Sequence, residues 1–320
     1  MTLPDLWIPN LWIPDLWVIV TLLAAAFQTV RFMLQKVLAA ATLSPAGATF
    51  ARFVYSAPLI ALLLAAYLQS TGAGLPATNM RFWAFGLLGG VTQILATVCV
   101  VALFKQRNFA VGITFKKTET IQTVLVGLLL LGEGVSPGGF AAIALGVLGL
   151  LFLSGGTAGD KAARGFRLSD LRNRAAGLGI ASGILFAFSA VSYRGATLAL
   201  DTPDPLLRAG VTLMAVVAMQ TVIMTVWLAL RERGEIAAVW RARRVAVWIG
   251  LTSMGGSLCW FIAFALQNAA YVKALGQVEL ILSVIASTLF FREKITAREG
   301  LGMAILCASI LLLILAIYGA

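Results

Sequence analysis

The sequence has no histidine, and only 12% of its 320 residues are charged. Without histidine, the chain lacks the commonest protein ligand for zinc or copper and the usual general base of enzymes. Cysteine is also scarce: Cys99, Cys259 and Cys307 all lie within apolar segments, where we expect small buried side chains rather than a disulfide or metal ligands. These absences predict a protein with no metal site, no cofactor and no catalytic residue.

Charged residues are few because hydrophobic ones dominate. Hydrophobic side chains make up 60% of the chain, and the mean hydropathy is +0.95, whereas a soluble domain of this size carries about a quarter charged residues. Such a chain cannot cover its surface with polar groups, so lipid must surround it. The net charge of +11 comes from Lys and Arg in short loops between apolar runs. That placement is typical of membrane orientation and argues against nucleic acid as a partner.

The apolar residues fall into ten stretches of about 20 residues, the length that a helix needs to cross the hydrocarbon core of a bilayer. The connections are short, except for two basic ones at 155–174 and 231–244. Residues 1–15 repeat a Leu-Trp-Ile-Pro unit and lack the basic start of a cleaved signal peptide, so we expect an interfacial segment. The predicted spans are 16–40, 45–69, 82–104, 109–131, 136–154, 175–200, 206–230, 245–266, 270–291 and 299–318.

The two halves of the sequence repeat one another at a shift of 160 residues. Ten of the 42 positions in 92–133 are identical to their counterparts in 252–293, and one of these pairs is Glu119 with Glu279. A biased membrane composition explains chance matches of leucine and alanine, but it does not easily explain paired glutamates. We therefore infer a true internal repeat.

Each half holds five predicted helices, an odd number, so the second half must cross the membrane in the opposite direction to the first. Inverted repeats of this kind place a binding site near the midplane, where the halves meet. We therefore predict an all-α integral membrane fold of ten transmembrane helices in two inverted five-helix repeats. The predicted divisions are an N-terminal segment at 1–15, a first repeat at 16–154, a basic linker at 155–174 and a second repeat at 175–320.

Two related motifs close the fourth and ninth predicted helices: LLLGEGVSPGG at 129–139 and TLFFREKITAREGLG at 288–302. In each, an apolar helix ends in Gly-Glu or Arg-Glu, and a hydroxyl residue precedes a Gly-rich helix. With these motifs, the chain from about residue 16 resembles the drug/metabolite transporter superfamily, specifically its EamA-type members. The segments FKKTETIQT at 115–123 and KALGQVELILS at 273–283 resemble the fourth and ninth helices of one bacterial branch.

The resemblance implies a membrane transporter of small organic metabolites or drugs, commonly an exporter, that works by alternating access. It also implies that helices 1–4 and 6–9 surround a central cavity, while helices 5 and 10 pack at the ends. Nothing in the motifs identifies the substrate.

Charged side chains inside the predicted helices are expected to face a cavity or an opposite charge, because an ionised group in hydrocarbon costs about 2.5–3.5 kcal/mol. Glu119 and Glu279 lie about halfway along their predicted helices and are the leading candidates for substrate contact or proton coupling. Lys116 and Arg31 would contact a substrate carboxylate or balance those charges. Alternatively, Lys116 and Glu119, three residues apart, simply neutralise each other. Polar or aromatic positions on the same helix faces add Gln28, Gln93, Tyr193, Trp260 and Ser283 as candidates.

Other charged residues receive structural interpretations. Lys36, Arg52 and Lys273 lie nearer to helix ends, so we expect their side chains to extend toward the membrane surface. Glu133 and Glu293 lie at junctions between helices, where a carboxylate can cap the next helix and complement its dipole. Trp260 is open to two interpretations, an aromatic wall for a ring or cation, or packing against lipid.

Together, these features predict a secondary transporter, with a small-molecule substrate and the lipid bilayer as partners and protons as a candidate coupling ion. The alternatives are a lipid or lipid-linked-sugar flippase, a membrane-embedded enzyme, and a receptor or scaffold without transport activity. The lack of histidine and of aspartate within the predicted spans argues against the enzyme.

Loop charges predict the orientation. The loops after the odd-numbered helices hold fifteen Lys and Arg residues, whereas the opposite side holds Arg81 and Arg208. Basic residues in short loops resist translocation, so the basic side is expected to be cytoplasmic. Both termini are then expected outside the cytoplasm of a bacterial inner membrane, although related transporters are often drawn with both termini inside.

Overall fold

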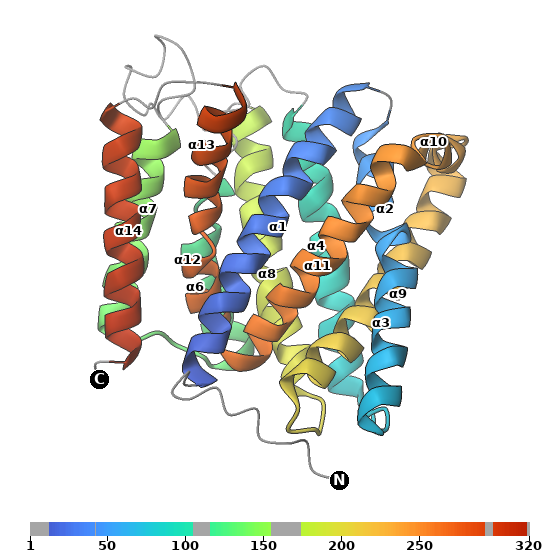
Figure 1. Ribbon diagram of the computed structural model, residues 1–320, viewed down its shortest axis with the longest axis horizontal. Helices are drawn as coiled ribbons and strands as arrows, with labels where there is room; N and C mark the ends of the chain where they lie inside the picture. The colour runs from blue at the N-terminus through green and yellow to red at the C-terminus, as the bar shows by residue number, and fades with distance from the viewer. Residues whose placement is uncertain (1–12, 42, 105–115, 155–173, 292–296, 319–320) are drawn as a thin grey trace.

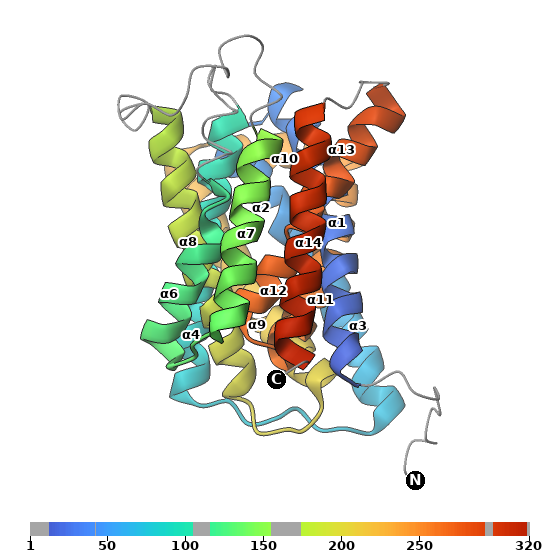
Figure 2. The same ribbon diagram turned by 90° about the vertical axis from the view of Figure 1, so that its left-hand side faces the viewer.

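The computed structural model describes residues 13–41, 43–104, 116–154, 174–291 and 297–318. These residues form one bundle of helices with no strand among them, and the long helices run roughly along a common direction (Figures 1 and 2). α1 (Ile13–Ala41) begins and α14 (Ala297–Tyr318) ends at the same end of the bundle (Figure 1). The all-helical part of the prediction is therefore confirmed.

The remaining helices divide between the two halves of the chain. The first half also holds α2 (Pro45–Val54), α3 (Ser56–Thr71), α4 (Met80–Phe104), α6 (Glu119–Leu131) and α7 (Pro137–Ser154). The second half also holds α8 (Arg174–Leu198), α9 (Pro205–Arg231), α10 (Glu235–Arg241), α11 (Arg243–Leu266), α12 (Ala269–Leu275) and α13 (Val278–Phe291).

The most extensive helix contacts join one half of the chain to the other. α4 packs against α8, α1 against α11, and α7 against α14, and the last of these pairs lies side by side in both views of the ribbon (Figures 1 and 2). The two halves therefore interdigitate around a common interior rather than forming separate domains.

Several helix ends follow from local sequence. Ser44 accepts a hydrogen bond from the Gly47 N–H before Pro45, and Asp204 accepts one from the Leu206 N–H before Pro205. A capping side chain followed by proline at the first helical position is a favourable helix start. These starts are 160 residues apart, and the spans that they open, Pro45–Thr71 and Pro205–Arg231, both contain 27 residues.

The segment predicted as one helix at 270–291 is broken into two. α12 stops at Leu275, Gly276 caps it, and α13 starts again at Val278. Glycine is unfavourable within a helix, and a Cβ at position 276 would overlap the Trp260 ring. Glu279 therefore lies in the first turn of α13, and Glu119 likewise lies in the first turn of α6 after a turn at 117–118. Glu279 still lies about halfway between Ala269 and Phe291, as expected, but the helix is interrupted there, whereas residues 105–115, which precede Glu119 and include the start of its predicted helix, lie outside the described residues.

Six of the described helical segments are long and apolar enough to cross a membrane: Pro45–Thr71, Met80–Leu103, Arg174–Leu198, Pro205–Arg231, Arg243–Leu266 and Gly300–Tyr318. Shorter apolar helices occupy Leu16–Arg31, Glu119–Leu131 and Pro137–Phe152. Large side chains such as Leu129 and Leu230 are exposed on the outside of the bundle, which suits a protein that lipid surrounds.

Candidate functional site

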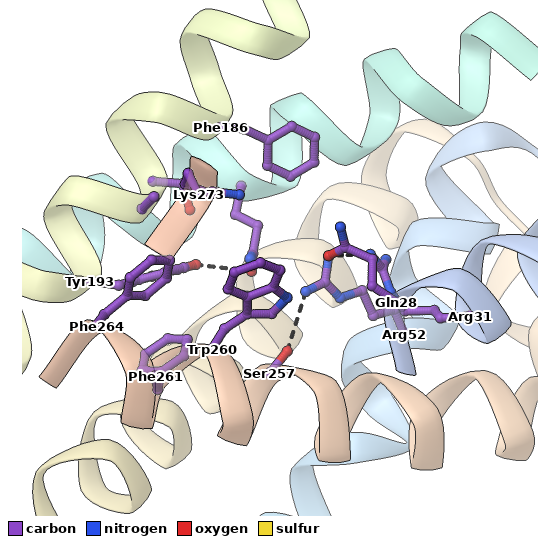
Figure 3. Close-up of a pocket in the computed structure, with 13 residues that line it drawn as sticks. Gln28, Arg31, Arg52, Phe186, Tyr193, Ser257, Trp260, Phe261, Phe264 and Lys273 are labelled. Atoms are coloured by element: carbon purple, nitrogen blue, oxygen red, sulfur yellow. Dashed lines mark hydrogen bonds between the residues drawn. The ribbon is translucent and has the colours of Figure 1, made fainter. Parts of the chain in front are cut away.

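A pocket lies inside the bundle, between helices that come from both halves of the chain (Figure 3). Its walls combine three cationic side chains with five aromatic ones and a few small polar groups. The lining residues are Gln28 and Arg31 of α1, Arg52 of α2, Gln93 of α4, Phe186, Ser189, Ala190 and Tyr193 of α8, Ser257, Trp260, Phe261 and Phe264 of α11, and Lys273 of α12.

Glu119 is held by two lysines beside the pocket. Its Oε1 lies 2.5 Å from the Lys273 Nζ, and its Oε2 lies 3.4 Å from the Lys116 Nζ. The carboxylate is 7% exposed, so these ion pairs lie in a region of low dielectric constant, where the charges attract strongly. The Lys273 Nζ also lies 5.0 Å from the centre of the Trp260 ring and 5.7 Å from that of Phe186.

Glu279 belongs to a separate network. Its Oε2 accepts a 2.6 Å hydrogen bond from the Gln28 Nε2, and the Gln28 Oε1 accepts one from the Arg31 Nη2 at 3.4 Å. Glu279 is 8% exposed. The two repeat-related glutamates are thus both buried next to cationic or amide groups: Glu119 pairs with the ammonium groups of Lys116 and Lys273, and Gln28 links Glu279 to the Arg31 guanidinium.

Arg52 has a different environment from the lysines. It is 5% exposed; its Nε donates to the Ser253 Oγ at 2.8 Å, its Nη1 to the Thr97 Oγ1 at 3.3 Å and its Nη2 to the Ser257 Oγ at 3.3 Å. We expected Arg52 and Lys273 to extend toward the membrane surface, and that prediction was wrong. Hydroxyl groups on α4 and α11 hold Arg52 inside the bundle, and Glu119 holds Lys273 there.

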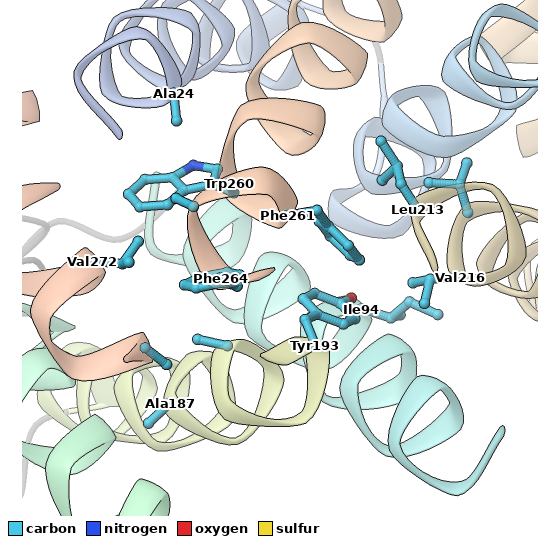
Figure 4. Close-up of a cluster of buried hydrophobic side chains, with 14 of the residues drawn as sticks. Ala24, Ile94, Ala187, Tyr193, Leu213, Val216, Trp260, Phe261, Phe264 and Val272 are labelled. Carbon is cyan, nitrogen blue, oxygen red and sulfur yellow. The ribbon is translucent and has the colours of Figure 1, made fainter. Parts of the chain in front are cut away.

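Packed aromatic rings form one side of the pocket. The Trp260 and Phe264 rings stack with their centroids 5.9 Å apart, and the Tyr193 and Phe261 centroids are 4.4 Å apart. These rings are part of the main buried apolar cluster (Figure 4). Trp260 is 9% exposed, so of the two interpretations left open for it, the wall of the cavity is the one that the structure shows.

A hydrogen-bond network fixes Tyr193 at the edge of this wall. The Tyr193 Oη donates to the Gln93 Oε1 at 2.9 Å, and the Gln220 Nε2 donates to the same Gln93 oxygen at 2.9 Å and to the Gly90 carbonyl at 3.0 Å. Sequence reasoning missed Gln220, which is fully buried on α9. A lone glutamine within an apolar span was the signal that could have identified it.

Glu133 lies away from the pocket and does not cap α7. The Ser136 Oγ accepts the Gly139 N–H at the start of that helix, while both Glu133 carboxylate oxygens accept hydrogen bonds from the Arg194 Nε, at 2.8 and 2.6 Å. The predicted cap at Glu133 was therefore wrong, because a shorter hydroxyl side chain nearer to α7 takes that position. Glu293, the other predicted cap, lies outside the described residues, as do the side chains of Ser283 and Lys36.

Comparisons with known proteins agree with this architecture. Residues 173–315 match the family described as the EamA-like transporter family. This half of the chain belongs to that family. The resemblance to the drug/metabolite transporter superfamily is thereby confirmed, and together with the apolar helices it makes this a multi-pass membrane protein. The EamA-like half supplies Trp260, Lys273 and Glu279, whereas Arg52 and Glu119 come from the preceding half.

A solved structure shows that the fold extends beyond the EamA-like half. It is described only as "Crystal structure of protein", and it is 15% identical to this chain, with a TM-score of 0.66. The match covers 92% of this chain and 95% of the other. No curated protein matches the sequence significantly.

Proposed function

We propose that this EamA-like protein is a secondary transporter that moves a small organic solute through the pocket between its two halves. The observation that carries the proposal is the pair of buried glutamates, each in the first turn after a helix break or turn, next to a pocket lined by charged side chains. Charged groups inside a membrane protein are costly and mark substrate or ion pathways. Interrupted helices near the midplane are typical of transporter binding sites.

The proposal includes alternating access between two inverted repeats of five helices each, at 16–154 and 175–320. Support comes from helix boundaries that recur at the 160-residue shift and from helix pairs that join the halves. The cavity volume of the pocket is only about 30 Å³, too small for an organic solute. An organic solute therefore needs the two halves to move apart before it enters or leaves.

Protons are the coupling ion that we propose, because Glu119 and Glu279 are the carboxylates buried beside the pocket among the described residues. Protonation of Glu119 would weaken its attraction to Lys273 and Lys116, and would change how α6 and α12 are held together. Uptake should then depend on a proton gradient and fall when an ionophore dissipates it.

The function is tested with purified protein in liposomes. A thermal-shift screen with organic acids, amino acids, nucleosides, polyamines and quaternary amines identifies a ligand, and flux of the radiolabelled ligand is then measured. We expect Glu119→Gln and Glu279→Gln each to reduce flux by about tenfold or more, equivalent to about 1.4 kcal/mol. Asp201→Asn, an exposed carboxylate in the loop after α8, is the matched control.

The outcomes separate the alternatives. Wild-type flux in both glutamate variants would contradict the proposed role of the pair. Chemical conversion of the ligand would indicate an enzyme, movement of labelled lipid between leaflets a flippase, and neither flux nor conversion a scaffold.

The proposed orientation in a bacterial inner membrane follows from the charges. α10, which belongs to the basic 231–244 segment, lies at the end of the bundle opposite to the start of α1 and the end of α14 (Figure 1). Since basic loops stay in the cytoplasm, the end of α14 should face outward. Alkaline phosphatase fused after α14 should be active, whereas a fluorescent green fluorescent protein fusion without phosphatase activity would reverse the orientation.

A further inference from the structure

The charges around the pocket do not balance within the described part of the chain. Five cationic side chains (Arg31, Arg52, Lys116, Lys117 and Lys273) lie at the pocket or interact with the two carboxylates beside it, those of Glu119 and Glu279. The other carboxylates with described side chains are at helix ends or in connections, namely Glu133, Asp201, Asp204, Glu232 and Glu235. A membrane interior tolerates such an excess poorly.

Arg52 is where this excess is clearest. Its three hydrogen bonds all go to neutral hydroxyl groups, and none of the described carboxylates forms an ion pair with it. A guanidinium has five N–H donors, so Arg52 keeps one further N–H on each terminal nitrogen. Two N–H groups on one guanidinium are what a carboxylate binds in the bidentate arrangement.

The surroundings of Arg52 reinforce the need for an anion. Figure 3 shows Arg31 and Gln28 beside Arg52 on one side of the pocket, opposite the aromatic residues. Gln28 links Arg31 to Glu279, so Arg52 is the guanidinium without a carboxylate among the described residues, and the positive charge of Arg31 beside it further favours an anion there. Lys273 does not supply a free cation, because Glu119 holds it.

The opposite side of the pocket is suited to an apolar or aromatic body. Trp260 and Phe264 form a stacked pair there, and Phe186 adds a third ring. A flat hydrophobic group gains burial and ring contacts against such a wall. A single ligand can thus place an acidic group at Arg52 and its body against Trp260.

We propose that the solute is an organic anion, whose carboxylate binds Arg52 beside Arg31 and whose apolar or aromatic body lies against Trp260. This inference rests on the proposed transport function, because it assigns a substrate class to the same pocket. Arg52 sets the charge preference, and the aromatic residues set the shape preference.

Binding is tested with the full-length purified protein and with probes that differ in charge but not in shape. The anions are phenylacetate and 3-phenylpropionate, and each is compared with its neutral amide and with the corresponding amine. We expect wild-type protein to bind the acids about tenfold or more tightly than the amides or amines, as measured by tryptophan fluorescence and thermal shift. Equal or tighter binding of the amides or amines, or no binding of either acid, overturns the proposal.

Variants of Arg52 test whether this residue causes the preference for acids over amides and amines. Arg52→Gln should weaken acid binding by about 10- to 100-fold, the range of a hydrogen-bonded charge, without changing amide binding. Arg52→Lys keeps the charge but loses the planar fork, so it should restore part of the affinity. Arg81→Gln, at the exposed start of α4, is the control and should bind as wild type. Unchanged acid binding in Arg52→Gln would exclude Arg52 as the anion site.

A measurement without ligand separates binding from a structural role. If Arg52 is kept for an anion, Arg52→Gln should melt at the wild-type temperature or above, because it removes a buried charge that lacks a carboxylate partner. A marked fall in melting temperature would mean that Arg52 is structural. Liposome assays distinguish failure of the transport proposal from failure of the anion proposal. Acids that bind but are not moved across the membrane contradict the transport function. Flux of amines alone contradicts the anionic substrate.

Discussion

Arg52 and Arg194 both lie within helices of the bundle, yet their partners differ in kind. The Arg194 Nε donates to both carboxylate oxygens of Glu133, and its Nη1 donates to the carbonyl oxygens of Phe264 and Gln267, each at 2.7 Å. Those carbonyls belong to the last turn and C-cap of α11, whose orphan acceptors a cation satisfies. Arg52 instead donates to three hydroxyls.

Their different partners indicate different roles: Arg194 stabilises the fold, whereas Arg52 belongs to the proposed anion site. At Arg194, Glu133 compensates the charge within the protein, and the result is a joint between α8, α11 and the loop before α7. At Arg52, the hydrogen bonds orient the guanidinium but leave its charge uncompensated. The proposed binding site must be free to bind and release an anion. Arg52 therefore cannot be paired with a carboxylate of the protein as tightly as Arg194 is paired with Glu133.

The largest expected effect on stability is at the joint. Arg194→Gln leaves the Glu133 carboxylate and two carbonyl groups without their donor, so we expect the free energy of unfolding to fall by about 2–4 kcal/mol, less than for a fully buried pair. The Glu133 side chain is 25% exposed, which is why the estimate is reduced. Chemical denaturation in detergent, with Arg52→Gln measured beside it, checks the comparison.

A double variant tests whether the loss of stability comes from leaving one charge of the Arg194–Glu133 pair without its partner. Arg194→Met combined with Glu133→Leu removes both charges and should recover much of the stability lost in either single variant. The comparison between the two arginines would fail if Arg52→Gln and Arg194→Gln proved equally destabilising.

The sequence alone could not separate these two arginines. Each lies in an apolar helix between one small and one aromatic residue. Only the fold places Glu133 next to Arg194 and three hydroxyl residues next to Arg52. The helix class and the burial of Glu119 and Glu279 were predictable from the sequence, because long apolar runs indicate helices and charged residues within those runs are expected to lie inside the bundle. The pairing of Lys273 with Glu119 was not, since those residues are more than 150 positions apart and meet only when α12 packs against α6.

The break between α12 and α13 was missed for a related reason. Gly276 interrupts an otherwise apolar run, and glycine is common enough in membrane helices that its presence alone predicts no break. The Trp260 ring occupies the space where a Cβ at position 276 would lie, so this contact, which the sequence does not reveal, requires glycine at the break. The same contact joins the helix break to the aromatic wall of the pocket.

A second, smaller effect is therefore expected at Gly276. Gly276→Ala pushes a methyl group into the Trp260 ring and should lower stability by about 1–3 kcal/mol. It should also weaken ligand binding, because the pocket wall must shift. Gly134→Ala is the matched control, since nothing lies within 4 Å of a Cβ at that position, and it should change neither property. Equal behaviour of the two variants would show that the close approach at Gly276 is unimportant.

The smallest expected effect is at Tyr193, which sits between the two regions: it lines the pocket and directly precedes Arg194. Tyr193→Phe removes the hydrogen bond to the Gln93 Oε1 but keeps the ring that packs on Phe261. Because Gln220 still donates to that Gln93 oxygen, no buried acceptor is left unsatisfied, and the loss of stability should be about 0.5–1.5 kcal/mol. Acid binding should stay within a few-fold of wild type, because Tyr193 belongs to the wall and Arg52 to the anion site. Thermal melts and acid titrations of this variant beside Arg52→Gln provide the check, and a tenfold loss of acid binding would move the anion site toward Tyr193.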